Sequence, residues 1–162
     1  MRLYFVRHAT PSDTAPSDFG RTLTPIGEEE ARIVGSALAK LGARPAHILT
    51  SPLIRARQTA EIIARTLGFE REVESIDELK NGSSTQSLLR LLNSYGGVNE
   101  IILVGHMPSL AEHISVMTGS NSSERFPLGK GSVACVEMDI PGGGGGRLVS
   151  LLHQAELKRL AA

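Results

Sequence analysis

Four charged or titratable side chains stand just beyond predicted strands. Arg7 and His8 follow the first apolar run of the chain, and His106 follows a later run, IILV. Arg55 lies near the start of the helix that is predicted after the segment AHILTS. In open α/β sheets the ligand crevice lies at the carboxyl ends of the strands, so these residues are expected to meet there although the sequence separates them. Together they would supply fixed positive charge and two titratable imidazoles to one ligand site.

The elements that must position these residues alternate between strand and helix. Short apolar runs predict strands over residues 2–6, 46–50, 72–76, 101–104, 132–140 and 147–153. Helical spacing and end signals predict helices from Thr24-Pro25 to Gly42, from Ser51-Pro52 to Gly68, over 84–95 and over 109–117. The run PGGGGG is expected to be a hairpin tip, and residues 154–162 to form a last helical turn or a frayed end. The pattern predicts a three-layer α/β/α sandwich with a mostly parallel central sheet and helices on both faces.

Composition is typical of a globular protein. The chain has 162 residues, 17 Lys+Arg against 17 Asp+Glu, and one cysteine, Cys135, in an alternating segment that is typical of packing. One domain over residues 1–162 is expected, because this length can bury a sizeable core. The zero net charge argues against nucleic acid and membrane partners, which attract clustered Lys and Arg. The sequence contains no recognisable signal peptide or membrane-spanning run, so a cytoplasmic location is expected.

Five motifs occur in a fixed order along nearly the whole chain. They are Phe5-Val6-Arg7-His8; Arg21-Thr22-Leu23-Thr24 with Gly27; Ser51-Pro52-Leu53-Ile54-Arg55-Ala56 with Gln58-Thr59; Asp77-Glu78-Leu79; and Val104-Gly105-His106-Met107-Pro108. On these motifs the chain resembles the histidine phosphatase superfamily, which includes the phosphoglycerate mutases, and within it the short SixA-like phosphohistidine phosphatases. One position departs from the family pattern. Ala9 stands where the family usually has glycine, which would restrict the backbone beside His8 or the approach of a substrate.

The resemblance implies a site for phosphoryl transfer. In it His8 is the nucleophile that forms a phosphohistidine intermediate, while the phosphoryl group is surrounded by Arg7, Arg55 and His106. Guanidinium groups and an imidazolium can stabilise the charge on the phosphoryl oxygens, so neither a metal ion nor another cofactor is expected. Neighbouring positive charge should lower the pKa of His8 and keep it neutral, whereas a bound phosphate dianion should favour a protonated His106.

Four further residues are weaker candidates for the site. Glu78 matches the position of a general acid that would protonate the leaving oxygen of a phosphate ester, and Asp77 is the alternative; either could instead be a solvated loop carboxylate. A phosphohistidine substrate needs such an acid less, because imidazole leaves more readily than an alkoxide. Arg21 is expected either to contact the substrate or to organise its loop, and Ser12 is a weaker candidate for a phosphate contact.

The leading functional hypothesis is a metal-independent phosphatase that acts on phosphohistidine in a signalling phosphotransfer protein. The short chain supports this choice, because it leaves little sequence for the insertions that enclose small substrates in the mutase-like members. The alternatives are a phosphatase of the same superfamily that acts on a small phosphate ester, and a phosphate-binding module without turnover.

Overall fold

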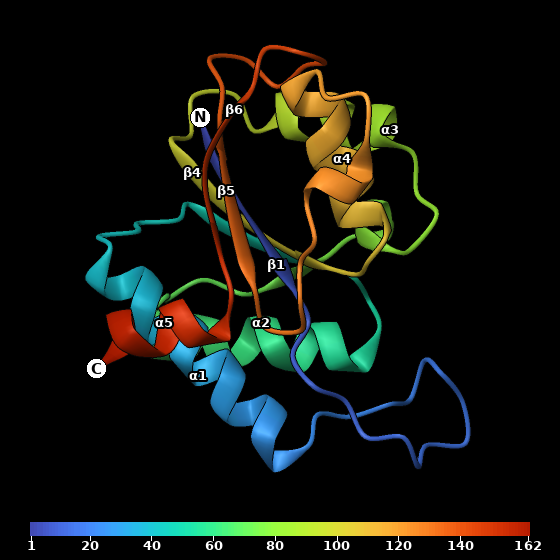
Figure 1. The fold of residues 1–162 in the computed structure, drawn as a ribbon, viewed down its shortest axis with the longest axis vertical. Helices are drawn as coiled ribbons and strands as arrows, with labels where there is room; N and C mark the ends of the chain where they lie inside the picture. Colours follow the sequence, from blue (N-terminus) through green and yellow to red (C-terminus); the bar gives the residue numbers. More distant parts are fainter.

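Six strands form one mixed sheet through the middle of the molecule (Figure 1). In the computed structural model, which describes residues 1–162, the sheet order is β3-β2-β4-β1-β5-β6. The strands are β1 (Arg2–Arg7), β2 (His47–Thr50), β3 (Glu74–Ser75), β4 (Glu100–Gly105), β5 (Val133–Glu137) and β6 (Arg147–Leu152). The pairs among β1 to β4 are parallel, whereas β5 runs antiparallel to both of its neighbours. The predicted mostly parallel sheet is confirmed.

Helices cover both faces of this sheet (Figure 1). One layer holds α1 (Pro25–Lys40), α2 (Ile54–Leu67) and α5 (Gln154–Ala161), and the other holds α3 (Thr85–Ser94) and α4 (Ser109–Thr118). Two short 3-10 helices, η1 (Asp77–Leu79) and η2 (Ser123–Arg125), lie in connections that the sequence left unassigned. The architecture is therefore the predicted three-layer α/β/α sandwich.

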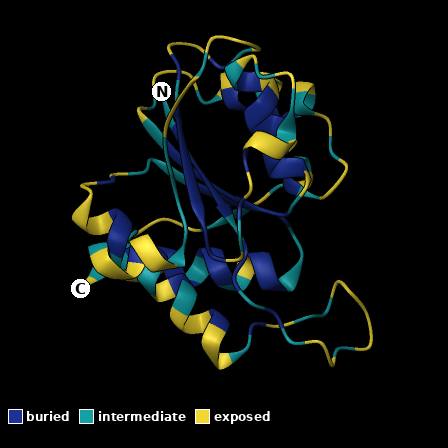
Figure 2. Ribbon diagram, viewed as in Figure 1, coloured by how far each residue is buried: buried dark blue, intermediate teal, exposed yellow.

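The central strand β1 shows how the two helical layers share one core. Leu3 and Phe5 pack with the apolar side chains of α3 and α4, while Tyr4 and Val6 pack with those of α1 and α2. All four side chains are buried, and Figure 2 shows the middle strands in the colour of buried residues. Burial on both faces explains why the strand reads as a continuous apolar run rather than an alternating one.

Several element ends follow the local signals that predict them, and others do not. Thr24 caps α1 by accepting a hydrogen bond from the Gly27 amide at 3.0 Å, and Gly68 ends α2 in the left-handed conformation. However, α2 begins at Ile54, because the residues from Ser51 to Leu53 still run as a connection after β2. Residues 154–161 form a complete helix, which settles the choice between a last turn and a frayed end. The glycine run joins β5 and β6 as the expected hairpin connection.

The strand register places four strand ends at the same level. Arg7 of β1 pairs with Gly105 of β4, and Thr50 of β2 pairs with Val104 of β4 and with Ser75 of β3. The residues that follow these strands must therefore emerge along one edge of the sheet. This edge holds His8, His106, the connection to α2, and η1.

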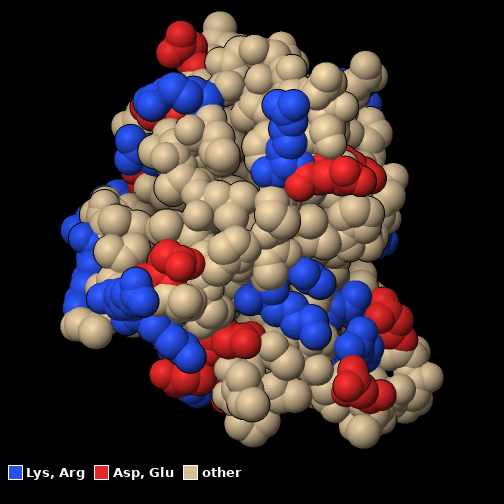
Figure 3. Space-filling model, viewed as in Figure 1, with Lys and Arg blue, Asp and Glu red and all other residues tan.

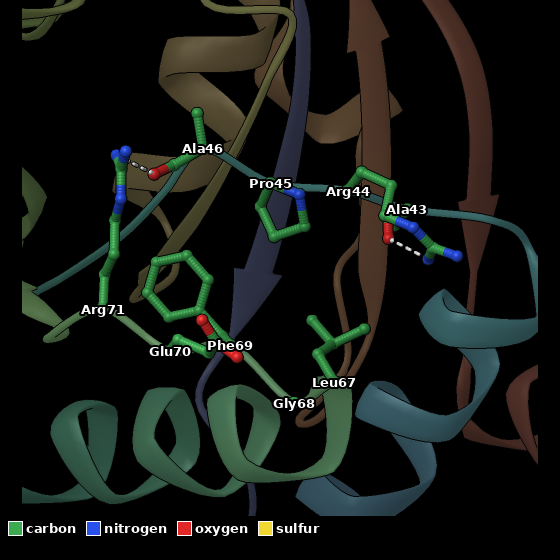
Figure 4. Close-up of a pocket in the computed structure, with 9 residues that line it drawn as sticks. All are labelled: Ala43, Arg44, Pro45, Ala46, Leu67, Gly68, Phe69, Glu70 and Arg71. Carbon is green, nitrogen blue, oxygen red and sulfur yellow. Dashed lines mark hydrogen bonds between the residues drawn. The ribbon is translucent and has the colours of Figure 1, made fainter.

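A large pocket lies at the opposite edge, where the chain enters β2 and β3 (Figure 4). It encloses about 560 Å³ between residues 43–46, which precede β2, and residues 67–71, which follow α2. Arg71 donates to the carbonyl of Ala46 at 3.1 Å, and Arg44 donates to the carbonyl of Ala43 at 3.0 Å. None of the predicted site residues lines this pocket.

None of the helices combines the length and the apolarity that crossing a bilayer would require.

The packing of Gly27 against the segment after His8 generates a first prediction. A Cβ atom on Gly27 would lie 2.1 Å from the carbonyl oxygen of Thr10, which is backbone and cannot rotate away. We expect Gly27→Ala to lower the free energy of unfolding by about 1–3 kcal/mol, because the helix and the Thr10 segment must separate. Denaturant unfolding measures this change. The control is Gly145→Ala, where no atom lies within 4 Å; equal effects of the two substitutions would contradict the steric explanation.

Candidate active site

His8 lies buried at the carboxyl end of β1 with one ring nitrogen already engaged. The residue is only 6% exposed, and its backbone amide donates to the carbonyl of Gly105 at 3.0 Å. Its Nδ1 lies 2.8 Å from the carbonyl oxygen of Ala9. A carbonyl can only accept a hydrogen bond, so Nδ1 carries the proton and Nε2 keeps its lone pair. This tautomer makes Nε2 the nucleophilic atom of the ring.

Arg55 lies beside that lone pair, on the first turn of α2. Its Nε donates to Nε2 of His8 at 3.4 Å, and the residue is 7% exposed. The hydroxyl of Thr59 donates to the backbone carbonyl of Arg55 at 2.7 Å and accepts from the amide of Ala9 at 3.1 Å. Thr59 therefore connects the start of α2 to the backbone that follows His8. Thr59 belongs to the third of the five sequence motifs, but nothing in the sequence predicted that it would link these two segments.

His106 and Arg7 complete the cluster. The ring centroids of His8 and His106 lie 5.1 Å apart, and Nε2 of His106 lies 2.8 Å from the hydroxyl of Ser51. Arg7 donates from Nη1 to the carbonyl of Leu128 at 2.9 Å. Nδ1 of His106 and Nε of Arg7 are buried and have no hydrogen-bond partner. Both atoms can therefore still form a hydrogen bond with a further polar group.

The electrostatics of the cluster keep both imidazole rings neutral. Burial lowers the pKa of His8 to about 3; the hydrogen bond to the Ala9 carbonyl opposes this shift, and the charges of the other site residues add to it. Burial likewise lowers the pKa of His106 to about 4, and Arg55 and Arg7 act in the same direction. At pH 7 the cluster therefore holds two guanidinium charges and two neutral rings. Such a site attracts a phosphate dianion, whose charge would in turn favour protonation of a nearby imidazole.

Arg21 and Ser12 lie in the loop between β1 and α1 and do not contact the cluster. The guanidinium of Arg21 donates to the carbonyl of Ser12 at 2.9 Å, to Asp13 at 3.1 Å and to Asp18 at 3.4 Å. The hydroxyl of Ser12 lies 2.8 Å from that of Thr14. Arg21 was predicted either to contact the substrate or to organise its loop, and these contacts are all within the loop.

The two carboxylates considered as general acids lie on η1, which follows β3. Asp77 forms an ion pair with Lys80 at 2.7 Å, while Glu78 is half-buried and forms neither a hydrogen bond nor an ion pair. Although β2 and β4 separate β3 from β1 in the sheet, η1 packs back against the end of β4: a Cβ atom on Gly105, the residue before His106, would lie 3.2 Å from the carbonyl oxygen of Leu79. Glu78 therefore lies on a segment that packs beside His106, and its role as general acid stays a prediction.

Ala9, the departure from the family pattern, does not obstruct the site. Its side chain is fully buried in a small apolar cluster with Leu23, Ala31 and Ile62. No residue other than glycine has a positive φ, so Ala9 adopts a backbone conformation that needs none of the freedom of glycine. The methyl group therefore points into the core rather than toward a substrate.

One site residue was missed entirely by the sequence reasoning. Asp18 accepts hydrogen bonds from Arg55 at two atoms: its backbone carbonyl from Nη1 at 2.8 Å, and its carboxylate from Nη2 at 3.2 Å. A single aspartate in a polar loop gives no signal of such a contact.

No group of three or more His, Cys, Asp or Glu side chains is arranged to hold a metal ion.

The depressed pKa of His8 generates a second prediction. Histidines in unfolded chains titrate near pH 6.5, whereas the folded protein should keep His8 neutral with its proton on Nδ1 as the pH falls from 7 toward about 4. ¹⁵N-detected NMR of the histidine rings measures both the titration and the tautomer. A midpoint for His8 near 6.5, or a proton on Nε2 at pH 7, would contradict the assignment of Nε2 as the nucleophile.

Comparisons with known proteins identify the family and agree with the fold. The model of the histidine phosphatase superfamily (branch 1) matches residues 3–86. An uncharacterised protein of Picosynechococcus sp. is 36% identical over 82% of this chain and 82% of its own length, and the phosphohistidine phosphatase SixA of Escherichia coli is 26% identical over 89% of both chains. Two solved structures share the fold. The protein histidine phosphatase SixA in complex with tungstate has a TM-score of 0.90 at 23% identity, and the match covers 98% of this chain and 100% of the SixA chain. The alpha-ribazole phosphatase of Shigella flexneri has a TM-score of 0.79 at 18% identity, covering 95% and 97%. Family membership supports phosphatase activity, and the match of the family model together with the relative at 36% identity shows that this chain belongs to the histidine phosphatase superfamily.

Proposed function

We propose that this protein is a phosphatase that forms a phosphohistidine intermediate on His8, and that its substrate is a phosphohistidine side chain of a signalling phosphotransfer protein. The tautomer of His8 and its position beside Arg55 support the first part. The similarity to SixA, named a phosphohistidine phosphatase, over 89% of the chain supports the second part.

In the first step, Nε2 of His8 attacks the phosphorus atom. The substrate ring enters protonated on its other nitrogen. A bond forms between Nε2 and phosphorus while the bond from phosphorus to the substrate nitrogen breaks, and its electron pair stays with the ring, which departs as neutral imidazole. Arg7 and Arg55 stabilise the negative charge on the phosphoryl oxygens, as does His106 once the dianion favours its protonation. The hydrogen bond from Nδ1 to the Ala9 carbonyl holds the ring in place and stabilises the positive charge that develops on it.

In the second step, water attacks the phosphorus atom of the intermediate. The new bond joins phosphorus to the water oxygen, the bond to Nε2 breaks, and its electron pair returns to the ring. One water proton passes to the phosphate product or to solvent, so His8 returns to its neutral form with the proton on Nδ1. No proton donor for a leaving group is required in this sequence.

The observation that carries the choice of substrate is the pairing of the carboxyl groups near the cluster. Glu78 and Asp77 form no hydrogen bond or ion pair with Arg7, His8, Arg55 or His106. Asp18 does contact Arg55, and although burial raises the pKa of its carboxyl, the hydrogen bonds and charges of Arg55 and Arg21 outweigh burial and lower it. An ionised carboxylate cannot act as an acid. An alkoxide leaving group needs a proton, whereas the imidazole of phosphohistidine does not, so the arrangement favours a phosphohistidine over an ester.

A second candidate is a small phosphate ester. The burial of the cluster favours it, because His8 and His106 are 6% and 3% exposed and a small molecule can reach a confined site more readily than a protein side chain. The alpha-ribazole phosphatase that shares the fold is named for a small substrate. This candidate keeps the same nucleophile and the same two steps.

The experiment that tests the proposal compares the wild-type protein with His8→Ala. Phosphate release is measured from a phosphohistidine phosphotransfer domain and from a panel of small phosphate esters, all without added metal. We expect the wild type to act fastest on the phosphohistidine domain, and His8→Ala to be slower by at least about 10³-fold, because removing a nucleophile removes the covalent route. Acid-labile phosphate should be trapped on the wild type alone.

A matched histidine variant controls for loss of folding. His47 is the first residue of β2, at the opposite end of that strand from the site, and its ring pairs with Glu74. His47→Ala should therefore retain the wild-type rate. Faster His8-dependent release from one small ester would keep the mechanism and change the substrate. Phosphate binding with no turnover on any substrate would instead identify a binding module, and undiminished turnover by His8→Ala would exclude His8 as the nucleophile.

A further inference from the structure

Asp18 places a negative charge at the edge of the proposed phosphate site. Its carboxylate lies 3.2 Å from Nη2 of Arg55, and its other oxygen lies 3.4 Å from Nη1 of Arg21. The side chain of Asp18 is 66% exposed, while that of Arg55 is 9% exposed. The carboxylate is therefore the accessible end of the pair, and the guanidinium is the enclosed end.

The guanidinium of Arg55 is shared between Asp18 and the nucleophile. Arginine has five N–H groups in a rigid plane. One points from Nε to His8, and one from each Nη nitrogen points to Asp18. The remaining two are free for phosphoryl oxygens. A phosphoryl group transferred to His8 would therefore lie within a few ångströms of the Asp18 carboxylate, because both bind the same small planar group.

The surface around the site carries both signs of charge. Figure 3 shows basic side chains gathered over the carboxyl end of β1, with acidic side chains beside them over the loop that follows this strand. In that loop, Asp13 and Asp18 both pair with Arg21, but only Asp18 also reaches Arg55. The phosphate of a substrate in this site would lie near the two arginines, Arg7 and Arg55. The chemical group that carries the phosphate would lie near the Asp18 carboxylate.

We propose that Asp18 determines which substrates are accepted by the charge of the group attached to the phosphate. It favours a cationic group, such as the protonated imidazole of phosphohistidine, and disfavours a second anionic group. This inference rests on the proposed function and names the feature by which the site would recognise its substrate. Asp18 would accept a hydrogen bond from the unphosphorylated ring nitrogen of the substrate and so stabilise the protonated, reactive form of the ring.

The chemistry of the first step is consistent with such a contact. The substrate ring enters as an imidazolium that bears phosphorus on one nitrogen and a proton on the other. When the bond to phosphorus breaks, its electron pair neutralises the ring, which leaves as imidazole with its proton still in place. Asp18 therefore neither gains nor loses a proton, which suits a carboxyl that Arg55 and Arg21 keep ionised. The charge attraction to Asp18 is lost as the ring becomes neutral and only a weaker hydrogen bond remains, which aids release of the product.

The test removes the charge of Asp18 and leaves its shape. Asp18→Asn can still accept a hydrogen bond from Arg55, so the guanidinium stays in place. The matched control is Asp13→Asn, which makes the same change in net charge in the same loop without touching Arg55. Dissociation constants are measured by calorimetry for glycerol 3-phosphate and for 3-phosphoglycerate, two ligands of similar size of which only the second has an extra carboxylate. Hydrolysis of a phosphohistidine peptide is measured in parallel.

For Asp18→Asn we expect the affinity for 3-phosphoglycerate relative to glycerol 3-phosphate to rise by about three- to tenfold, since a unit charge several ångströms away at partial exposure has an effect of this order. We expect kcat/KM for the phosphohistidine peptide to fall by a similar factor, and Asp13→Asn to change neither quantity. Equal changes for both small ligands would show that Asp18 only positions Arg55, and identical results for the two variants would reduce its effect to general surface charge. Either result overturns the proposal. If the wild type does not hydrolyse the peptide, the proposed function fails, but the ratio of the two affinities still decides the role of Asp18.

Discussion

The parallel pairing of β2, β4 and β1 is the constraint on which the site depends. It brings the ends of three strands to one level, so the residues that follow them emerge side by side although up to about a hundred positions separate them in the chain. Adjacent strands lie about 4.8 Å apart. The rings of His8 and His106, which follow the adjacent strands β1 and β4, have centroids 5.1 Å apart, close to one strand spacing. The separation of the two imidazoles is thus inherited from the backbone hydrogen bonds of the sheet.

Burial then decides the protonation states at this edge. The sheet end is covered by the loop after β1 and by the segment around Leu128, so the imidazoles lose most of their contact with water and their pKa values fall to about 3 and 4. Guanidinium groups stay charged under conditions that neutralise imidazole. The combination of buried arginine and buried histidine therefore separates the two functions that the proposed mechanism needs and that a single residue type could not supply together: a fixed positive charge to bind an oxyanion, and a neutral nitrogen to attack phosphorus.

The fold and the side chains of the cluster follow from different kinds of sequence information. Apolar runs and helix caps such as Thr24 predicted the six strands and the helices α1 to α4, because each of these signals is local, whereas the sequence left α5 open and η1 and η2 unassigned. The grouping of Arg7, His8, Arg55 and His106 followed from a general rule about strand ends. The tautomer of His8 and the contact of Asp18 with Arg55 were not predictable in this way, because they depend on where one carbonyl oxygen and one loop carboxylate lie in space. The harmless burial of Ala9 likewise depends on a small apolar cluster built from three other segments.

The position of Glu78 shows how a connection can offset strand order. The sequence places this carboxyl after a strand end, as it places His106, and the strand before it, β3, lies at the far edge of the sheet from β1. The backbone of η1 nevertheless packs against Gly105 at the end of β4, immediately before His106. The carboxylate that pairs with Arg55 is that of Asp18, and the arginines it contacts hold its pKa below the ordinary value. Under the proposed function, the leaving group of the substrate therefore decides whether a proton from a residue such as Glu78 is needed at all.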